Sequence, residues 1–251
     1  MNDPVIDVVS FYMNNAKPAI LDAQKQVFDA LSIPLRQVCD TCSHSVFLTK
    51  FLRSQPASME AVVFFDIDCV PLDDSVFWRL VRSAISDQSL VGCAQQANHI
   101  DTARYWKWHG RLPRYRRIVE KIRRAIRHSR GVPNPPYLKP LTYAGPCFMI
   151  IPMKGYRELG SPSLEVEPEE FDAAGRLTHE WQNAGKSVKL LWPTDCELPK
   201  FRYGDVIGFG LGTTFDSFAY HAFESTHVKD SDSPERFVHR CNELMTTLRH
   251  G

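Results

Sequence analysis

The feature that most constrains the fold is a run of five apolar residues that ends in two carboxylates. Residues 61–65 read Ala-Val-Val-Phe-Phe, and Asp66, Ile67 and Asp68 follow directly. Because the run is apolar at every position, it predicts a strand buried on both faces, as at the centre of a parallel sheet. Such a strand places Asp66 and Asp68 at the carboxyl edge of the sheet, where open α/β sheets bind ligands.

The segments around this run alternate between strand-like and helix-like patterns. The strand-like segments are residues 5–12, 35–39, 90–94, 148–151 and 187–192. The helix-like segments are residues 18–31, a helix capped by Ser43, 76–85, 171–184 and a C-terminal helix from Ser233 with Phe237, Cys241, Leu244 and Leu248 facing inward. The glycine-rich residues 201–214 predict a mobile loop. The βαβαβαβ order of the first part predicts a mostly parallel sheet with helices on both faces.

Composition and charge are those of an ordinary globular protein. The chain has 251 residues, 43% apolar and 24% charged, with a net charge of +1. This length suits one large α/β domain with a core of normal size. The near-neutral charge gives no support to nucleic-acid binding.

The seven cysteines and the apolar runs bear on the compartment. An odd, widely spaced set of cysteines argues against a disulfide framework and favours a reducing compartment. Cys39 and Cys42 form a C-x-x-C without a second pair, so we interpret them as two ordinary thiols. No signal-peptide pattern and no membrane-length apolar run is present, so we expect a cytoplasmic protein, at most peripheral to a membrane.

The two carboxylates predict a metal site. Neighbouring carboxylates repel each other, and burying them unpaired is costly, so a divalent cation is a natural partner. Oxygen ligands favour Mn²⁺ or Mg²⁺, which often share their coordination with substrate phosphates. The alternative is a solvated acidic turn without a ligand.

The string from Asp66 to Val70 resembles the haloacid-dehalogenase phosphatases. In that family Asp66 would be a phosphoryl-accepting nucleophile and Asp68 an acid/base. The family carries its motif on the first strand, however, whereas a complete βαβα unit precedes Asp66 here. No downstream Lys followed by an acidic metal pair is found either. A phosphatase is therefore kept as the alternative.

Over most of its length the chain resembles the GT-A glycosyltransferases, the nucleotide-diphospho-sugar transferase superfamily. There a D-x-D motif follows a nucleotide-binding βαβα half. Residues 143–160 resemble the segment beside the donor sugar, and residues 171–191 resemble the helix and strand that carry the catalytic acid. Residues 220–225 resemble the C-terminal segment that often supplies a His to the metal.

The resemblance implies a fold and a division of the chain. We expect one GT-A domain over residues 1–251, with a mixed, mainly parallel, Rossmann-like sheet flanked by helices. Residues 1–94 would form the nucleotide-binding half, residues 95–140 a basic helical insertion, and residues 141–251 the acceptor and catalytic half.

The resemblance also implies an activity. It is the metal-dependent transfer of a sugar, of hexosyltransferase type, from a nucleotide-diphosphate sugar to a hydroxyl of a saccharide or lipid-linked saccharide, in glycan or polysaccharide synthesis. A UDP-sugar is the favoured donor.

The resemblance also implies roles for the residues of the metal site. Asp68 would bind the metal directly, and Asp66 would contact the ribose or bind the metal through water. His221 would be the third ligand, with His227 a poorer candidate. An ordinary loop or core histidine is the alternative for His221. A non-catalytic sugar-nucleotide-binding protein on the same fold also stays open.

The nucleotide is expected over the ends of the first two strands. Phe11, Tyr12, Asn14 and Asn15 fit the first βα loop, where an aromatic ring could stack on the base. Asp40 follows the second strand and could accept a hydrogen bond from a uracil-type imide. The alternative is that Asn and Asp favour strand ends because they form turns.

The sugar and the acceptor are expected further along the chain. Ala144 and Gly145 would let the backbone approach the sugar closely, or would form a tight turn before a strand. Asp172 is the best placed general base, with Glu169 and Glu170 as rivals. The family's paired acids are not reproduced at Asp172, so the base and the inverting or retaining outcome stay open.

Residues 107–130 are strongly basic. They contain ten Lys and Arg and one acid, Glu120, and therefore carry a charge of +9. Ile118, Ile122 and Ile126 recur every four residues, which predicts an amphipathic helix. We favour a helix that packs on the domain with a solvated basic face. The alternative is contact with an anionic membrane or with the diphosphate of a lipid-linked acceptor.

Overall fold

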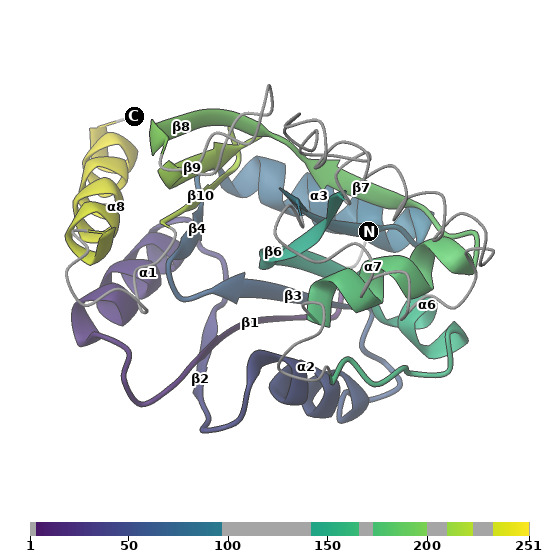
Figure 1. The fold of residues 1–251 in the computed structure, drawn as a ribbon. Helices are drawn as coiled ribbons and strands as arrows, with labels where there is room; N and C mark the ends of the chain where they lie inside the picture. Colours follow the sequence, from purple (N-terminus) through teal and green to yellow (C-terminus); the bar gives the residue numbers. More distant parts are fainter. Residues whose placement is uncertain (1–3, 97–141, 166–172, 200–209, 223–232, 251) are drawn as a thin grey trace, which may run out of the picture.

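The computed structural model describes residues 4–96, 142–165, 173–199, 210–222 and 233–250. Within them a six-stranded sheet has the order β2-β1-β3-β6-β5-β7 (Figure 1). Five strands run in one direction, and β6 runs antiparallel to both β3 and β5. The predicted fold class, a mixed and mainly parallel sheet flanked by helices, is confirmed. The strands are β1 (Ile6–Tyr12), β2 (Arg36–Cys39), β3 (Ala61–Asp66), β5 (Leu90–Gln96), β6 (Thr142–Pro152) and β7 (Val188–Leu191).

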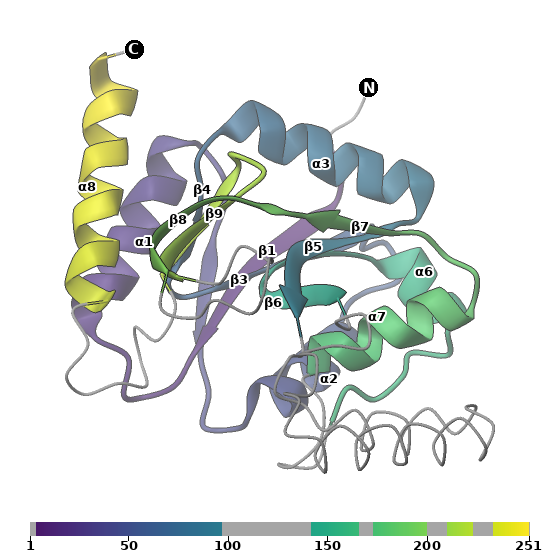
Figure 2. The same cartoon turned by 45° about the horizontal axis from the view of Figure 1, so that its top comes forward.

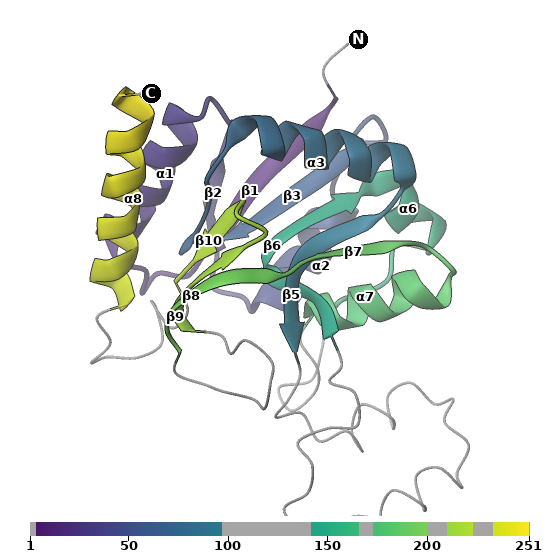
Figure 3. The same cartoon turned by 90° about the horizontal axis from the view of Figure 1, so that it is seen from above.

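Helices cover both faces of this sheet (Figures 2 and 3). On one face lie α1 (Pro18–Ala30) and α3 (Asp74–Asp87), with α8 (Ser233–His250) packed alongside α1. On the other face lie α2 (His44–Arg53), α6 (Met153–Glu158) and α7 (Ala173–Asn183). Among the helices of the described residues, none combines the length and the hydropathy that a membrane span requires.

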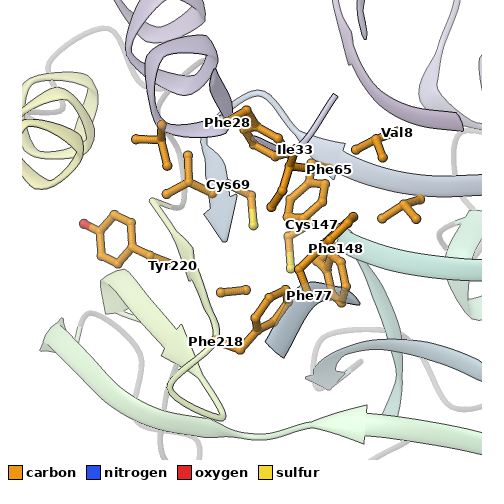
Figure 4. Packing of buried hydrophobic residues seen from close by; sticks show 14 of the residues in the cluster. Val8, Phe28, Ile33, Phe65, Cys69, Phe77, Cys147, Phe148, Phe218 and Tyr220 are labelled. Atoms are coloured by element: carbon orange, nitrogen blue, oxygen red, sulfur yellow. The ribbon is translucent and has the colours of Figure 1, made fainter. Parts of the chain in front are cut away.

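The side chains of β3 explain this two-sided packing. Val63 and Phe65 belong to the core beneath α1 and α3, whereas Val62 and Phe64 belong to the core beneath α2 and α7. Alternate residues of a strand point to opposite faces, so a strand that is apolar at every position must be buried on both. Figure 4 shows Phe65 between Phe28 and Phe148, with ring centroids 4.9 and 4.8 Å away. Full burial of each such ring stabilises the fold by about 1.5–3 kcal/mol.

A second sheet lies at the end of β3 and was not predicted. Its four antiparallel strands have the order β4-β10-β9-β8. They are β4 (Cys69–Pro71), β8 (Pro193–Pro199), β9 (Gly210–Phe215) and β10 (Ala219–His221). The prediction of a mobile loop over residues 201–214 was therefore wrong for residues 210–214, which belong to β9. Because β4 follows β3 after a turn of two residues, the second sheet begins where the apolar strand ends.

Two further predictions need correction. The strand expected at residues 148–151 begins at Thr142, so Ala144 and Gly145 lie within β6 and not in a tight turn. Leu248 of α8 is 38% exposed rather than directed inward, because the last turns of α8 extend beyond the core. The basic segment 107–130 and the candidates Glu169, Glu170, Asp172 and His227 lie outside the described residues.

Candidate metal and nucleotide site

The acidic turn joins the two sheets. Asp66 is the last residue of β3, and Asp68 immediately precedes β4. Between them Ile67 is 6% exposed and packs in the core beneath α1 and α3. Burial of Ile67 fixes the orientation of the turn and leaves its two neighbours at the carboxyl edge of the main sheet.

Gln24 holds the two ends of this turn together. It is fully buried in α1, and its Nε2 donates hydrogen bonds to the carbonyl oxygens of Asp66 (2.7 Å) and Cys69 (2.9 Å). Its Oε1 accepts a hydrogen bond of 3.1 Å from Gln37 on β2. The sequence analysis missed Gln24. The available signal was a polar residue on the apolar face of the predicted helix, beside Ala23 and Val27.

His221 reaches the turn through strand pairing. β10 pairs with β4 so that His221 lies opposite Cys69, and the amide of Ala222 donates a 2.9 Å hydrogen bond to the carbonyl oxygen of Asp68. This register places His221 Nε2 3.1 Å from Oδ1 of Asp68 and 3.8 Å from Oδ2 of Asp66. Residues about 150 positions apart in the sequence therefore meet at one point.

Asp66, Asp68 and His221 form a cluster suited to a divalent cation. One ligand atom from each lies within 4.8 Å of the other two. The side chains are 17%, 9% and 6% exposed, respectively. Two carboxylates so close and so little hydrated repel each other, and a cation removes that repulsion. The two carboxylates suit Mn²⁺ or Mg²⁺, and the imidazole is a ligand typical of transition-metal ions, so these three residues fit the predicted Mn²⁺ better than Mg²⁺.

The electrostatics of His221 reflect the two carboxylates. Burial by itself lowers the pKa of His221, because it disfavours the charged imidazolium. The charge of Asp68, its hydrogen bond to the ring and the charge of Asp66 together outweigh burial, so the pKa of His221 lies above its ordinary value of 6.5. The two carboxylates therefore favour the protonated form of His221 over the neutral form when no cation is bound.

The thiols beneath the turn do not compete as ligands. Cys69 and Cys147 are buried in the core near the end of β3 (Figure 4), and Cys93 of β5 is buried in the same cluster. Burial raises the pKa of the Cys69 thiol well above its usual range, and Cys147, Asp66 and Asp68 add to that effect. Because the thiolate is the form that binds metals, these residues act as apolar core groups.

His44 was missed by the sequence analysis and lies on the other side of Asp66. It is the first residue of α2, and its Nδ1 is 3.9 Å from Oδ1 of Asp66. Its ring packs edge-on against Phe11, with centroids 4.8 Å apart, and near Phe64 at 6.0 Å. The side chain is 41% exposed. From the sequence, this position indicated only the start of a helix.

The residues predicted for the nucleotide base occupy different environments. Phe11 is 1% exposed and stacks on Phe47 with centroids 4.4 Å apart, so its ring belongs to the core. Tyr12, the next residue, is half-buried at the end of β1. Asn14 and Asn15 are exposed in the following loop, and Asn14 Oδ1 accepts a 2.9 Å hydrogen bond from the Cys39 thiol. In this structure Tyr12 is the aromatic side chain of that group at the surface.

Asp40 forms a turn at the end of β2. Its amide donates to the carbonyl oxygen of Tyr12 (3.0 Å), and its Oδ1 accepts hydrogen bonds from the amides of Thr41 (2.6 Å) and Cys42 (3.2 Å). The amides of Cys42 and Thr41 lower the pKa of Asp40, so its carboxylate is held in the charged form. A contact between Asp40 and a base stays a prediction. Cys39 and Cys42 are free thiols.

Ala144 and Gly145 lie along the same sheet edge as the acidic turn. Phe148 pairs with Phe65, the residue before Asp66, so the part of β6 that precedes Phe148 extends past the end of β3. There Ala144 and Gly145 pair with β5 and are buried, and the amide of Ala144 donates a 3.1 Å hydrogen bond to Thr178 Oγ1. Their contact with a sugar stays a prediction.

Comparisons with known proteins give only distant likenesses. No protein-family model matches the chain, and no curated protein sequence matches it. Among solved structures, the catalytic domain of Drosophila beta1,4galactosyltransferase 7 in complex with xylobiose is 8% identical with a TM-score of 0.45, covering 92% of this chain and 78% of that chain. A mutant of that enzyme in complex with manganese, UDP-Gal and xylobiose is 8% identical with a TM-score of 0.41, covering 92% and 79%.

A third solved structure is that of a synthase and not of a glycosyltransferase. The 4-diphosphocytidyl-2C-methyl-D-erythritol synthase of Anaerococcus prevotii is 10% identical with a TM-score of 0.42, covering 76% of this chain and 90% of that chain. Likenesses at this level carry no inference about function. The function proposed below therefore rests on the residues of this chain.

Proposed function

We propose that this chain is a metal-dependent glycosyltransferase of the GT-A type. It would move a sugar from a nucleotide-diphosphate sugar, with a UDP-sugar favoured, to a hydroxyl of a saccharide acceptor. The observation that carries the proposal is the convergence of Asp66, Asp68 and His221 within 4.8 Å at the carboxyl edge of a mainly parallel sheet. At the same edge, the candidate nucleotide residue Tyr12 ends β1, and Asp40 directly follows β2.

Each residue of the cluster has a distinct role in this proposal. Asp68 and His221 are the least exposed members and would hold the cation directly. Asp66 is the more exposed carboxylate and would meet both the cation and the donor. A bound Mn²⁺ or Mg²⁺ supplies neutralisation of the diphosphate that departs from the sugar. Because β3 and β4 are buried strands, the two carboxylates are held in place before the donor arrives, so ordering them adds little to the cost of binding.

The rest of the donor site follows the strand ends. Tyr12, Asn14, Asn15 and Asp40 would bind the nucleoside, and Ala144 and Gly145 would face the sugar along β6. A carboxylate must take the proton of the acceptor hydroxyl if the configuration is inverted, and Asp172, Glu169 and Glu170 are the candidates. We extend the proposal to one GT-A domain over residues 1–251, acting in the cytoplasm on glycan precursors.

Calorimetric titration of UDP and GDP tests the donor site. Each nucleotide is added to the protein with Mn²⁺ and with EDTA, and the series is repeated on Asp68→Ala. The control is Asp29→Asn, an exposed carboxylate of α1 that pairs with Lys25. We expect metal-dependent binding of one nucleotide by the wild type and by Asp29→Asn, and no binding by Asp68→Ala. If the wild type binds neither UDP nor GDP in the presence of Mn²⁺, the proposal is overturned.

Turnover then separates an enzyme from a binding protein. The wild type is incubated with the UDP- or GDP-sugars of the base that binds, and release of the nucleoside diphosphate is measured with and without saccharide acceptors. Acceptor-stimulated release supports transfer. Binding without release from any sugar would leave a sugar-nucleotide-binding protein, and phosphate release from a phosphomonoester would favour the phosphatase.

A further inference from the structure

The carboxylate of Asp66 lies between two imidazoles that face different oxygens. Oδ2 faces His221 Nε2 at 3.8 Å, on the side of Asp68, whereas Oδ1 faces His44 Nδ1 at 3.9 Å. The first contact belongs to the metal cluster. The second joins Asp66 to α2, an element that contributes no residue to that cluster.

The distance between His44 and Asp66 suits one bridging oxygen. At 3.9 Å the two atoms are too far apart for a direct hydrogen bond, which spans about 2.7–3.2 Å. A single oxygen placed about 2.8 Å from each would join them at an angle of roughly 90°. A hydroxyl suits this position, because it can donate to the Asp66 carboxylate and accept from the imidazole N–H.

The ring of His44 is held for such a contact. Phe11 of β1 and Phe64 of β3 pack edge-on against the ring. The backbone of His44 is fixed because it is the first residue of α2. The side chain nevertheless remains 41% exposed, so a ligand can reach it. A side chain that is both held and accessible loses little conformational entropy when it binds.

The strand order indicates which part of a nucleotide would lie here. β2, β1 and β3 are adjacent, and they end at Cys39, Tyr12 and Asp66. In the proposed site the base lies over Tyr12 and Asp40, and the diphosphate lies at the cation of Asp68. The ribose connects the two and must therefore lie between these positions. His44 contacts residues of both β1 and β3 and therefore occupies that intermediate position.

We propose that His44, together with Oδ1 of Asp66, binds a ribose hydroxyl of the nucleotide donor and makes the site selective for ribonucleotides. The inference rests on the proposed function, since it takes a metal-bound nucleoside diphosphate as the ligand. It assigns to His44 a role in specificity, separate from the metal ligands.

The test is a cycle of protein variants and ligand variants. Affinities for UDP, 2′-deoxy-UDP and 3′-deoxy-UDP are measured with Mn²⁺ on the wild type, His44→Phe and His44→Gln. The corresponding guanosine set is used if GDP is the nucleotide that binds. His44→Phe keeps an aromatic ring against Phe11 but removes the hydrogen bond, whereas His44→Gln keeps a hydrogen-bonding group. His239→Ala, on the exposed surface of α8, is the control.

We expect the wild type and His239→Ala to prefer the ribonucleotide over one of the deoxy analogues by about tenfold, the usual effect of one hydrogen bond. His44→Phe should lose part of that preference, because only the contact with Asp66 remains, while its affinity for the deoxy analogue stays unchanged. His44→Gln should recover part of the loss. Equal weakening of all three ligands in His44→Phe, or an unchanged preference, would overturn this inference and leave the proposed function standing. Failure of the wild type to bind any nucleotide would instead overturn both.

Discussion

The imidazole of His221 lies 3.1 Å from the carboxylate of Asp68 because β10 pairs with β4, the strand that begins directly after Asp68. The same pairing provides the hydrogen bond from the Ala222 amide to the Asp68 carbonyl. The metal cluster thus depends on the join between the two sheets: β3 of the first sheet supplies Asp66, and β10 of the second supplies His221.

Asp68→Asn should abolish stabilisation by metal. It removes one of two carboxylates but leaves the Asp68 backbone bonds, so the variant should fold. At a Mn²⁺ concentration one hundred times its Kd, the wild type gains about 2.7 kcal/mol. In a chain of this size that gain raises Tm by roughly 5–10 °C. Thermal unfolding with Mn²⁺ and with EDTA measures the difference, and Asp29→Asn should behave as the wild type. An equal rise in Asp68→Asn would place the cation elsewhere.

Manganese affinity should increase with pH. A cation and a proton compete for His221, and the carboxylates raise the pKa of this imidazole above 6.5 in the metal-free protein. Affinity should therefore fall as pH falls through that raised pKa. Titration of Mn²⁺ between pH 6 and 9 measures the slope. In His221→Asn the slope should flatten over this range, and an equally steep slope in the variant would show that His221 is not a ligand.

The metal-free protein should show the opposite dependence in its stability. Because the folded-state pKa of His221 is raised, the imidazolium contributes stability that is fully present below the unfolded pKa of about 6.5 and is lost as pH rises through the folded pKa. Urea unfolding in EDTA at several pH values compares the wild type with His221→Asn. The free-energy difference between them should shrink as pH rises. A difference that stays constant or grows would contradict the charged state assigned to His221.

The acidic turn was predictable because its signal is local. Five apolar residues and two carboxylates stand together in the chain, so the strand, its burial and the edge position of Asp66 follow from the pattern alone. Phe11 illustrates a limit of such patterns. It was assigned to the first βα loop, where its ring could stack on the base, but it lies within β1, and the alternation of the strand turns its ring toward Phe47 of α2.

The second sheet was not predictable in the same way. β4 and β10 have three residues each, too few for a periodic pattern, and their pairing joins positions far apart in the sequence. His221 entered the predicted site through a family resemblance, and its register opposite Cys69 is a tertiary property. His44 was missed for the same reason, since its relation to Asp66 depends on how α2 packs against Phe11.

Gln24→Leu should loosen the acidic turn. The substitution leaves the carbonyl oxygens of Asp66 and Cys69 without their buried donor, and such a loss costs about 1–3 kcal/mol. Urea unfolding in EDTA measures this cost, and titration of Mn²⁺ should show weaker binding because the carboxylates are no longer held. The matched control is Gln26→Leu, an exposed position of the same helix that should change neither quantity. A Gln24→Leu protein with wild-type stability and Mn²⁺ affinity would show that the turn is held without Gln24.

Gly92→Ala should destabilise the sheet, and a second substitution should partly reverse the effect. A Cβ at Gly92 would lie 2.7 Å from Ala144 Cβ and 3.1 Å from the Phe148 carbonyl oxygen, at the point where β5 and β6 change register. Crowding of this kind costs about 1–3 kcal/mol.

The double variant Gly92→Ala/Ala144→Gly removes the nearest methyl and should restore part of the loss. Urea unfolding of the wild type, both single variants and the double variant should therefore give a favourable coupling free energy. Additive losses would mean that the Phe148 backbone, and not Ala144, sets the space at Gly92. Because Ala144 is also a candidate to face the donor sugar, Ala144→Gly measured alone with a nucleotide-sugar separates its part in packing from its part in binding.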